Sequence, residues 1–254
     1  ICNQDIDLII VATTTPDKVF PSTACIIQRQ LGLKNIPAFD LQAVCSGFVY
    51  GLDVATRFVT TGGSSNALVI GSETLSRIVD WTDRDTCVLF GDGAGAVILQ
   101  ESDVPGIIST HIHADGEYEE LLHVPAGISN GYQQLREENA FIQMKGNEVF
   151  RKAVGTLGSI AKETLMENGV SQDELTWLVP HQANLRIILA AAKKLNLPME
   201  QVIVTVDEHA NTSSASIPLA LDVAVRDGRI KEGDLLLLEA FGGGFTWGSA
   251  LVCY

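Results

Sequence analysis

The feature that most constrains the fold is a repeated alternation of apolar runs with stretches of helical periodicity. The first run, Ile6–Ala12, is apolar along its length, as in a strand that is buried on both faces of a sheet. Pro21 then stands where a helix can begin, apolar residues follow at helical spacing, and Gly32 stops the pattern. Strand, helix and strand in this order predict a mostly parallel sheet that is covered by helices.

The alternation continues to the end of the chain. The first part is predicted to contain the strands Pro37–Val44, Ala67–Ile70 and Gly95–Leu99 and the helix Gly47–Thr60. After a linker-like segment at residues 101–106, the predicted strands are Ile107–His113, Phe141–Lys145, Leu175–Val179, Val202–Val206, Leu235–Glu239 and Gly248–Cys253, and the predicted helices are Asn147–Asn168, Ala183–Leu195 and Ile217–Asp227. An irregular stretch, Asp115–Asn139, interrupts this second part.

The two parts echo one another. Leu8–Thr14 and Trp177–His181 are both apolar strands that end in polar residues before a helix, and Phe90-Gly91 and Phe241-Gly242 both open a glycine-rich hairpin. We therefore expect two related halves, residues 1–100 and 101–254, that pack sheet to sheet.

Charge and cysteine content narrow the class of protein. With 31 Asp and Glu against 17 Lys and Arg, the net charge is −14, which argues against nucleic acid as a partner because that surface must be basic. The five cysteines are scattered without a close pair, which favours a reducing, cytoplasmic compartment over a disulfide framework. We expect no signal peptide and no membrane span, and, because the chain starts at Ile1 and is in a strand by residue 6, we expect a preceding segment.

Cys45 is the candidate nucleophile. It ends a predicted strand and directly precedes Ser46, Gly47 and a helix, a geometry that presents nucleophiles in other α/β enzymes. The positive end of the helix dipole is expected to lower the pKa of the thiol and to favour the thiolate. The alternative is a buried structural cysteine.

Two further polar residues follow predicted strands. His181 comes after Leu175–Val179 at the end of the strand where α/β folds place ligand contacts, and Pro180 fixes the backbone before it. Asn211 lies in a small polar loop, residues 209–216. Each has a simpler interpretation, His181 as a backbone-bonding residue near a helix start and Asn211 as part of a capping loop.

Two segments are rich in glycine. Phe241–Phe245 has more glycine than a turn requires, which would let a ligand approach backbone N–H groups, as in an oxyanion hole. Gly91–Gly95 superficially matches a dinucleotide fingerprint, but a strand follows it instead of a helix, so we predict a tight hairpin there.

The remaining candidates are metal ligands and a basic stripe. Alternation places His111 and His113 on one face of a strand, but neither Asp115 nor His123 adds the usual ligand spacing, so we predict no metal site. On the predicted helix 183–195, Arg186 and Lys193 share a face, and Lys194 follows. In so acidic a chain this stripe favours docking of an acidic partner, with a solvated helix face as the alternative.

Cys45, His181 and Asn211 form a Cys-His-Asn set. They stand with the strings Pro-His-Gln-Ala-Asn-Leu-Arg, Asn-Thr-Ser-Ser-Ala-Ser and Glu-Ala-Phe-Gly-Gly-Gly-Phe-Thr-Trp-Gly-Ser-Ala. With these motifs the chain closely resembles the β-ketoacyl-acyl carrier protein synthase III family of the thiolase-like superfamily, which starts bacterial type II fatty acid synthesis. Elongating condensing enzymes use Cys-His-His, so Asn211 points to the initiating type.

The resemblance implies a five-layered αβαβα thiolase-like fold of two related halves, each with a mixed sheet. The segment expected before Ile1 would hold the opening strand and residues that bind coenzyme A. Two positions depart from the family, which often has Ala where Val44 stands and Gly where Ala210 stands. Both changes are small and leave the chemistry plausible, although Val44 would alter the acyl pocket slightly.

The resemblance also implies a mechanism. Cys45 takes an acyl group from acyl-coenzyme A, with acetyl-coenzyme A as the expected donor, while the N–H groups of Cys45 and Gly243 form the oxyanion hole. Malonyl-acyl carrier protein then loses carbon dioxide, His181 and Asn211 stabilise the enolate, and the carbanion attacks the acyl-Cys45 to give β-ketoacyl-carrier protein. Coenzyme A takes part as a substrate thioester, and no cofactor or metal is implied.

Further site residues are implied by matched family positions. The acyl pocket would be formed by Phe20, which reaches into the partner of a homodimer, and by Phe90, Leu122 and Ile142. The pantetheine channel would be lined by Arg84, Met144, Asn147, Phe150 and Asn184, and the carrier protein would meet Arg151, Arg186, Lys193 and Lys194. Two rival functions stay open: a Cys-His-Asn enzyme of secondary metabolism, of the quinolone or polyketide type, and a non-catalytic subunit of the same fold.

Overall fold

The structure, a computed structural model, describes residues 1–137 and 140–254, so residues 138–139 at the end of the predicted irregular stretch lie outside it. The first sheet has the order β2-β1-β3-β4 and comprises β1 (Leu8–Ala12), β2 (Ala38–Leu41), β3 (Asn66–Thr74) and β4 (Asp92–Gln100). Strand β1 runs parallel to β2 and β3, whereas β4 is antiparallel to β3, so the sheet is mixed.

The second sheet is mixed in the same way. Its order is β5-β10-β9-β8, formed by β5 (Ile107–Ala114), β10 (Thr246–Cys253), β9 (Leu235–Gly242) and β8 (Trp177–Pro180). Strands β8 and β9 are parallel, and β10 is antiparallel to both of its neighbours. A separate two-stranded sheet pairs β6 (Leu122–His123) with β7 (Gln143–Met144).

The helices connect and cover these sheets. They are α1 (Thr23–Gln30), α2 (Gly47–Thr60), α3 (Gly131–Glu137), α4 (Gly146–Glu167), α5 (Leu185–Lys194), α6 (Val206–His209) and α7 (Ser216–Arg226). Short 3-10 turns occur at Asn3–Asp5, Val44–Ser46, Leu75–Arg77, Gly116–Leu121, Ile128–Asn130, Gln172–Glu174, Met199–Gln201 and Ser213–Ala215.

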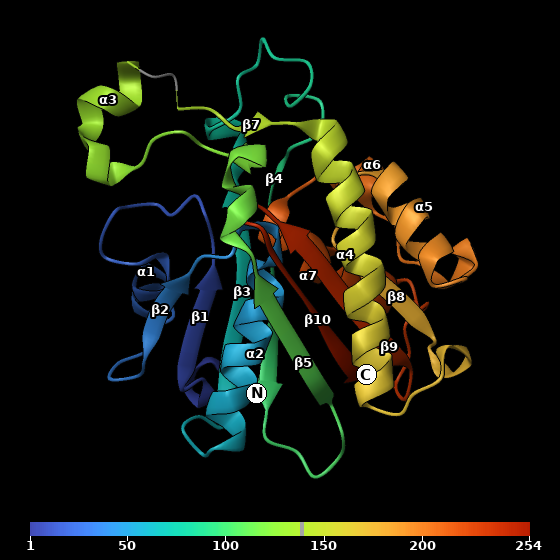
Figure 1. Ribbon diagram of the computed structural model, residues 1–254. Helices are drawn as coiled ribbons and strands as arrows, with labels where there is room; N and C mark the ends of the chain where they lie inside the picture. The colour runs from blue at the N-terminus through green and yellow to red at the C-terminus, as the bar shows by residue number, and fades with distance from the viewer. Residues whose placement is uncertain (138–139) are drawn as a thin grey trace.

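Five layers result from where the apolar faces are buried (Figure 1). Helix α1 packs on the outer face of the first sheet, and α4 and α5 pack on the outer face of the second. Between the sheets lie α2 and α7, whose residues Phe48 and Ile217 share one core with Ile10 of β1 and Leu238 of β9. The predicted αβαβα arrangement is therefore confirmed. Because this central core joins both parts, whether each half behaves as a domain of its own stays a prediction.

Two local predictions are wrong. The predicted strand Val202–Val206 is only a single bridge between Val202 and Leu178, after which the chain turns into α6. The glycines at 91–95 do not form a tight hairpin. Instead Gly93 and Gly95 belong to the start of β4, and Gly91 directly precedes it. A side chain at Gly95 would lie 2.8 Å from Pro218 of α7, so glycine permits close packing of helix on sheet.

The structure also bears on membrane association. Among the residues it describes, none of the helices is both long enough and apolar enough to cross a bilayer.

Candidate active site

Cys45 is held in a strained turn between β2 and α2. The preceding residue, Val44, has a φ of 47°, in the left-handed region that is costly for a β-branched side chain. Two hydrogen bonds fasten the turn to β10: Ser46 Oγ donates to the Thr246 carbonyl at 3.0 Å, and Thr246 Oγ1 donates to the Ala43 carbonyl at 2.9 Å. The predicted sharp turn before the helix is thus present, and its strain is offset by contacts from the other half of the chain.

The glycine-rich segment after β9 lies directly against this turn. A β-carbon on Gly242 would come within 2.7 Å of the Cys45 backbone nitrogen, so no larger residue fits there. The next peptide carries the N–H of Gly243, which keeps that group near Cys45. Its role in an oxyanion hole, together with the Cys45 N–H, stays a prediction.

His181 continues the ladder of β8. Its N–H donates to the carbonyl of Glu239 at 2.7 Å, which fixes the backbone at the end of the strand. Its ring Nδ1 lies 2.6 Å from Ser216 Oγ, and that oxygen also accepts the N–H of Gln182 at 3.2 Å. Nδ1 is thus engaged at the start of α7, which leaves Nε2 as the ring nitrogen available for chemistry.

Asn211 is held by the loop that precedes β4. Its N–H donates to Leu89 at 2.9 Å, and its carbonyl accepts from Gly91 at 3.0 Å. Its side-chain Oδ1 accepts the N–H of Ser213 at 2.9 Å, so the amide NH₂ group is left to donate elsewhere. Ala210 before it has φ 60° and ψ −164°, a conformation suited to glycine, which is the residue common at this position in the family that the sequence resembles.

One cavity brings these three residues together. Its volume is about 450 Å³. Cys45, His181 and Asn211 reach it from three separate connections, after β2, after β8 and before α7. Of the other predicted residues, the cavity is lined by Phe90, Leu122, Met144, Asn147, Phe150, Asn184 and Arg186. Asn184 is also the N-cap of α5, where its Oδ1 accepts the N–H of Ile187.

Several predicted residues lie elsewhere. Ile142 does not line the cavity, because it is buried behind Leu122 and Phe90 in a neighbouring apolar cluster. Arg84 is exposed and absent from the lining, to which the adjacent Asp85 contributes instead. Three exposed basic residues and one exposed aromatic residue also lie outside the cavity: Arg151, Lys193, Lys194 and Phe20.

The structure adds residues that the sequence analysis missed. Phe241 and Leu157 contribute apolar lining, and Ser216 contacts His181. Two buried carboxyl groups also lie near the candidate catalytic residues: Glu73 at the end of β3 and Glu239 in β9. In the sequence, each of these two glutamates stands as a single acidic residue among the residues of a strand, and this pattern could have identified them.

The electrostatics of Cys45 differ from the expectation. Burial raises the pKa of the Cys45 thiol to about 12, and the charge of Glu73 adds to that rise. The nearby Ser213 hydroxyl opposes it, without forming a hydrogen bond of standard geometry. The prediction of a lowered pKa is therefore wrong for the resting protein, because desolvation outweighs the field of the α2 N-terminus.

Burial acts in the opposite direction on His181. It lowers the pKa of the imidazole to about 3, since the charged form is the one that loses solvation. His181 is consequently neutral across the physiological pH range, and it can donate one ring N–H without carrying a charge.

Glu239 is the most unusual titratable group near the site. It is fully buried, and neither carboxyl oxygen has a hydrogen-bond partner among the described residues. Burial alone raises its pKa to about 8, so the carboxyl group is largely protonated at neutral pH. Its backbone carbonyl meanwhile positions His181.

This shift predicts a pH-dependent stability. Glu239 binds its proton more tightly in the folded than in the unfolded state, so its contribution is greatest at low pH and is lost as the pH rises from about 4.5 to about 8. Glu239→Gln is expected to remove this dependence, on the order of 4 kcal/mol between pH 5 and 8.5. Urea unfolding at both pH values measures it, with the exposed Glu200→Gln as the control. An unchanged pH dependence in Glu239→Gln would show that the carboxyl is solvated.

The histidines considered as metal ligands lie away from the cavity. His111 and His113 do share one face of β5, as the alternation predicted, and both approach Glu163 of α4. Asp115 caps a 3-10 turn by accepting the N–H of Glu117, and His123 lies in β6.

Known proteins resemble this chain along its length. The family model described as 3-oxoacyl-[acyl-carrier-protein] synthase III matches residues 39–116, and the model of the C-terminal part of that synthase matches residues 165–254. A β-ketoacyl-[acyl-carrier-protein] synthase III from Thioalkalivibrio sulfidiphilus is 68% identical over 250 residues, which cover 98% of this chain and 78% of the relative.

Solved structures of β-ketoacyl synthases also resemble this chain. The crystal structure of 3-oxoacyl-[acyl-carrier-protein] synthase III from Aquifex aeolicus has a TM-score of 0.94 and 48% identity, and the match covers 100% of this chain and 79% of that one. The priming β-ketosynthase of the R1128 polyketide pathway has a TM-score of 0.91 and 38% identity, covering 99% of this chain and 76% of that one.

Proposed function

The chain belongs to the 3-oxoacyl-[acyl-carrier-protein] synthase III family. We infer that it is a condensing acyltransferase that initiates fatty acid synthesis. The observation that carries the inference is the convergence of Cys45, His181 and Asn211 on one cavity. A non-catalytic subunit has no need of a nucleophile at a strained turn, and the identity of 68% to a β-ketoacyl synthase III exceeds the 38% to a polyketide priming enzyme.

In the proposed first step Cys45 attacks the thioester carbon of an acyl-coenzyme A. The thiol is protonated at rest, so its proton must leave as the sulfur–carbon bond forms, and the departing coenzyme A thiolate takes up a proton in exchange. The N-terminus of α2 stabilises negative charge on the sulfur during the attack. The N–H groups of Cys45 and Gly243 would hold the carbonyl oxygen.

The proposed second step uses the two neutral donors. Malonyl-acyl carrier protein loses carbon dioxide, and the electron pair left behind becomes an enolate whose oxygen needs hydrogen bonds. Ser216 Oγ accepts a hydrogen bond from the N–H of Gln182 and would donate its own proton to Nδ1 of His181. The Nε2–H of His181 would then be available to donate to the enolate oxygen. The free NH₂ of Asn211 supplies the second donor.

A neutral imidazole suits this step. The buried His181, with its pKa lowered to about 3, cannot protonate the carbanion as an imidazolium ion would. The carbanion is then free to attack the acyl-Cys45 carbonyl, which releases Cys45 and forms β-ketoacyl-acyl carrier protein.

The cavity supports a long, mostly apolar substrate arm. Met144, Phe150 and Asn184 lie along it, and the Arg186 guanidinium stands 5.3 Å from the centre of the Phe150 ring. Coenzyme A and the carrier protein both present a pantetheine arm, so one channel can serve both steps. The proposed reaction requires no resident cofactor, since both chemical steps use thioester substrates and side chains of the protein.

The direct test is turnover. The protein is incubated with acetyl-coenzyme A and malonyl-acyl carrier protein, and the products are followed by mass spectrometry. We expect acetoacetyl-carrier protein, free coenzyme A and carbon dioxide in equal amounts. Turnover only with larger or aromatic acyl donors would instead favour the secondary-metabolism alternative.

The solvent face of α5 is the proposed docking site for the carrier protein. This face exposes three basic residues, Arg186, Lys193 and Lys194. It also exposes two apolar residues, Leu185 at 48% and Leu189 at 44%. The N-terminal end of this helix lines the cavity, so a partner bound along α5 would lie at its mouth. Carrier proteins are acidic and would be repelled by the rest of a surface with a net charge of −14.

Charge reversal tests this face. Lys193→Glu with Lys194→Glu is expected to raise the KM for malonyl-acyl carrier protein and to weaken its salt dependence, because rim charges steer association. Acylation by acyl-coenzyme A should change little, which also checks that the variant folds. The control, Lys34→Glu with Lys231→Glu, makes the same change in net charge at two exposed lysines elsewhere. Equal effects of the two pairs would exclude α5 as the docking face.

Two further properties are proposed. A homodimer is supported by Phe20, which is 83% exposed outside the cavity of its own chain, and a monomer in sedimentation equilibrium would refute it. A cytoplasmic location is supported by the five free cysteines, and recovery of the protein outside the cytoplasmic fraction of its host would refute it.

A further inference from the structure

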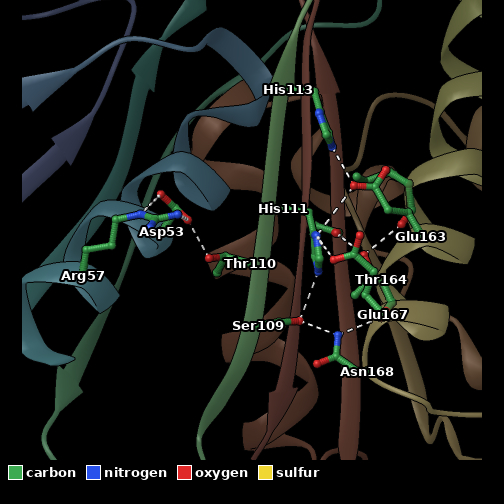
Figure 2. A network of polar contacts seen from close by, with 12 residues as sticks. Asp53, Arg57, Ser109, Thr110, His111, His113, Glu163, Thr164, Glu167 and Asn168 are labelled. Carbon is green, nitrogen blue, oxygen red and sulfur yellow. Dashed lines mark hydrogen bonds and ion pairs between the residues drawn. The ribbon is translucent and has the colours of Figure 1, made fainter.

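Two histidines and two glutamates converge where β5 packs against α4, on the side of the second sheet away from α2 (Figure 2). His111 Nδ1 lies 3.7 Å from Glu163 Oε1 and 3.6 Å from Glu167 Oε2. His113 Nε2 lies 2.9 Å from the same Glu163 oxygen. None of these residues belongs to the active-site cavity.

The two glutamates of this cluster lie close to each other, and Arg151 and Lys152 line the groove beside Glu163. Glu163 and Glu167 are one helical turn apart on α4, and both approach the same imidazole nitrogen. Among the described residues, neither glutamate forms an ion pair with a lysine or an arginine. Two carboxylates held this close repel each other, and the repulsion is relieved by a bound cation.

The spacing of the ligand atoms suits a small transition-metal ion. One ligand atom each from His111, Glu163 and Glu167 lie within 4.8 Å of one another. A tetrahedral ion with bonds of about 2.0–2.1 Å needs its ligand atoms roughly 3.3–3.4 Å apart. The distances from His111 Nδ1 to the oxygens of Glu163 and Glu167 are within a few tenths of an ångström of this value. His113 contacts the Glu163 oxygen from the side, as a hydrogen-bond partner of that ligand.

The histidines are oriented by a second set of contacts. Nε2 of His111 lies 3.3 Å from Ser109 Oγ, which in turn accepts a hydrogen bond from Asn168 Nδ2 at 2.7 Å. The ring of His113 stacks on Trp247, with centroids 5.7 Å apart. A hydrogen bond to the far nitrogen of a ligating histidine is the usual means by which proteins fix its tautomer and direction.

The site is also accessible. His113, Glu163 and Trp247 line a shallow groove of about 400 Å³, and the Glu167 side chain is 57% exposed. The side chain of His111 is 12% exposed. An ion can therefore enter from solvent and reach a partly desolvated nitrogen.

We propose that His111, Glu163 and Glu167 form a binding site for a first-row divalent transition-metal ion, with Zn²⁺ as the best fit, a water molecule as the fourth ligand and His113 orienting the Glu163 carboxylate. Imidazole and carboxylate ligands at this spacing favour Zn²⁺ over Ca²⁺ and Mg²⁺, which prefer more oxygen ligands. The bound ion clamps β5 to α4 and is independent of the condensation chemistry.

The test uses the whole chain after treatment with a chelator, and Zn²⁺ alone as the ligand. Isothermal titration should show one ion per chain, and the thermal midpoint should rise with added Zn²⁺. His111→Gln and Glu167→Gln should each weaken binding at least tenfold and remove most of that rise. The exposed Glu200→Gln is the matched control and should bind as the original protein does.

Cobalt distinguishes this site from the cysteines. Co²⁺ at the proposed site should give the visible bands of a four-coordinate ion without the charge-transfer band of a thiolate ligand. A thiolate band, equal Zn²⁺ affinity in Glu167→Gln, or a thermal midpoint raised equally by Ca²⁺ would each overturn the proposal. The cluster would then be a hydrogen-bonded link between β5 and α4. Circular dichroism of Glu167→Gln without metal checks that its fold is unchanged.

Discussion

Replacing Cys45 by alanine is expected to abolish acyl transfer. Cys45 is the cysteine that lines the cavity with His181 and Asn211, while the other four lie outside it. Intact-protein mass spectrometry after incubation with acetyl-coenzyme A should show one added acetyl mass in the original protein and none in Cys45→Ala. Product formation with malonyl-acyl carrier protein should fall below detection, because no covalent acyl-enzyme can form.

Cys87→Ala is the matched control, since Cys87 is a partly buried thiol that does not line the cavity. It should load as the original protein does. Acyl label that stays in Cys45→Ala and maps to Cys25 or Cys87 would contradict the assignment.

The raised pKa adds a pH dependence to the same assay. Because burial places the pKa of Cys45 at about 12, the thiolate fraction should grow with pH throughout an assay range of roughly 6 to 9. Single-turnover acylation rates should rise accordingly. If the acylation rate instead reaches a plateau near neutral pH, the bound substrate or the helix N-terminus lowers the pKa of Cys45 far below its value in the free protein.

The second large effect concerns His181 and Asn211. His181→Ala and Asn211→Ala should each still load an acetyl group on Cys45 but should decarboxylate malonyl-acyl carrier protein slowly. Each loses one donor to the enolate oxygen, and loss of such a donor costs roughly 10²–10³ in rate. Release of labelled carbon dioxide measures decarboxylation, and intact mass measures loading.

The matched control for these variants is Ser214→Ala. Ser214 lies in the same loop as Asn211 but does not line the cavity, and its hydroxyl bonds to the Ala12 carbonyl at 2.8 Å and to Glu73 at 3.3 Å. It should retain decarboxylation within a few-fold. If His181→Ala and Asn211→Ala lose loading while keeping decarboxylation, the two residues serve the first step instead of the second.

Most of the secondary structure follows from local sequence. The helix at Gly47–Thr60 was predicted at its observed bounds, and the buried strand at the start of the chain was found within two residues, because apolar periodicity reports burial directly. The pattern failed at Val202–Val206. That segment is as apolar as a strand, but only Val202 bridges a neighbour, and the chain then enters α6.

The candidate catalytic residues could be predicted without the structure. A cysteine before a helix, a histidine after a strand and an asparagine in a small polar loop were identified from residue type and position, and the structure places all three on one cavity. Such side chains stand at strand ends because connections there are free to carry polar groups.

The electrostatics of Cys45 and the cluster of polar residues around His111 depend on contacts between distant elements of the fold. The sign of the pKa shift at Cys45 depends on how much solvent the folded chain excludes, which neighbouring residues in sequence do not reveal. The spacing of His111 and His113 suggested no metal site, because Glu163 and Glu167 lie about 50 residues further along the chain and reach β5 only when α4 packs on the sheet. Local periodicity specifies each element, whereas contacts between distant elements arise from the packing of their buried faces.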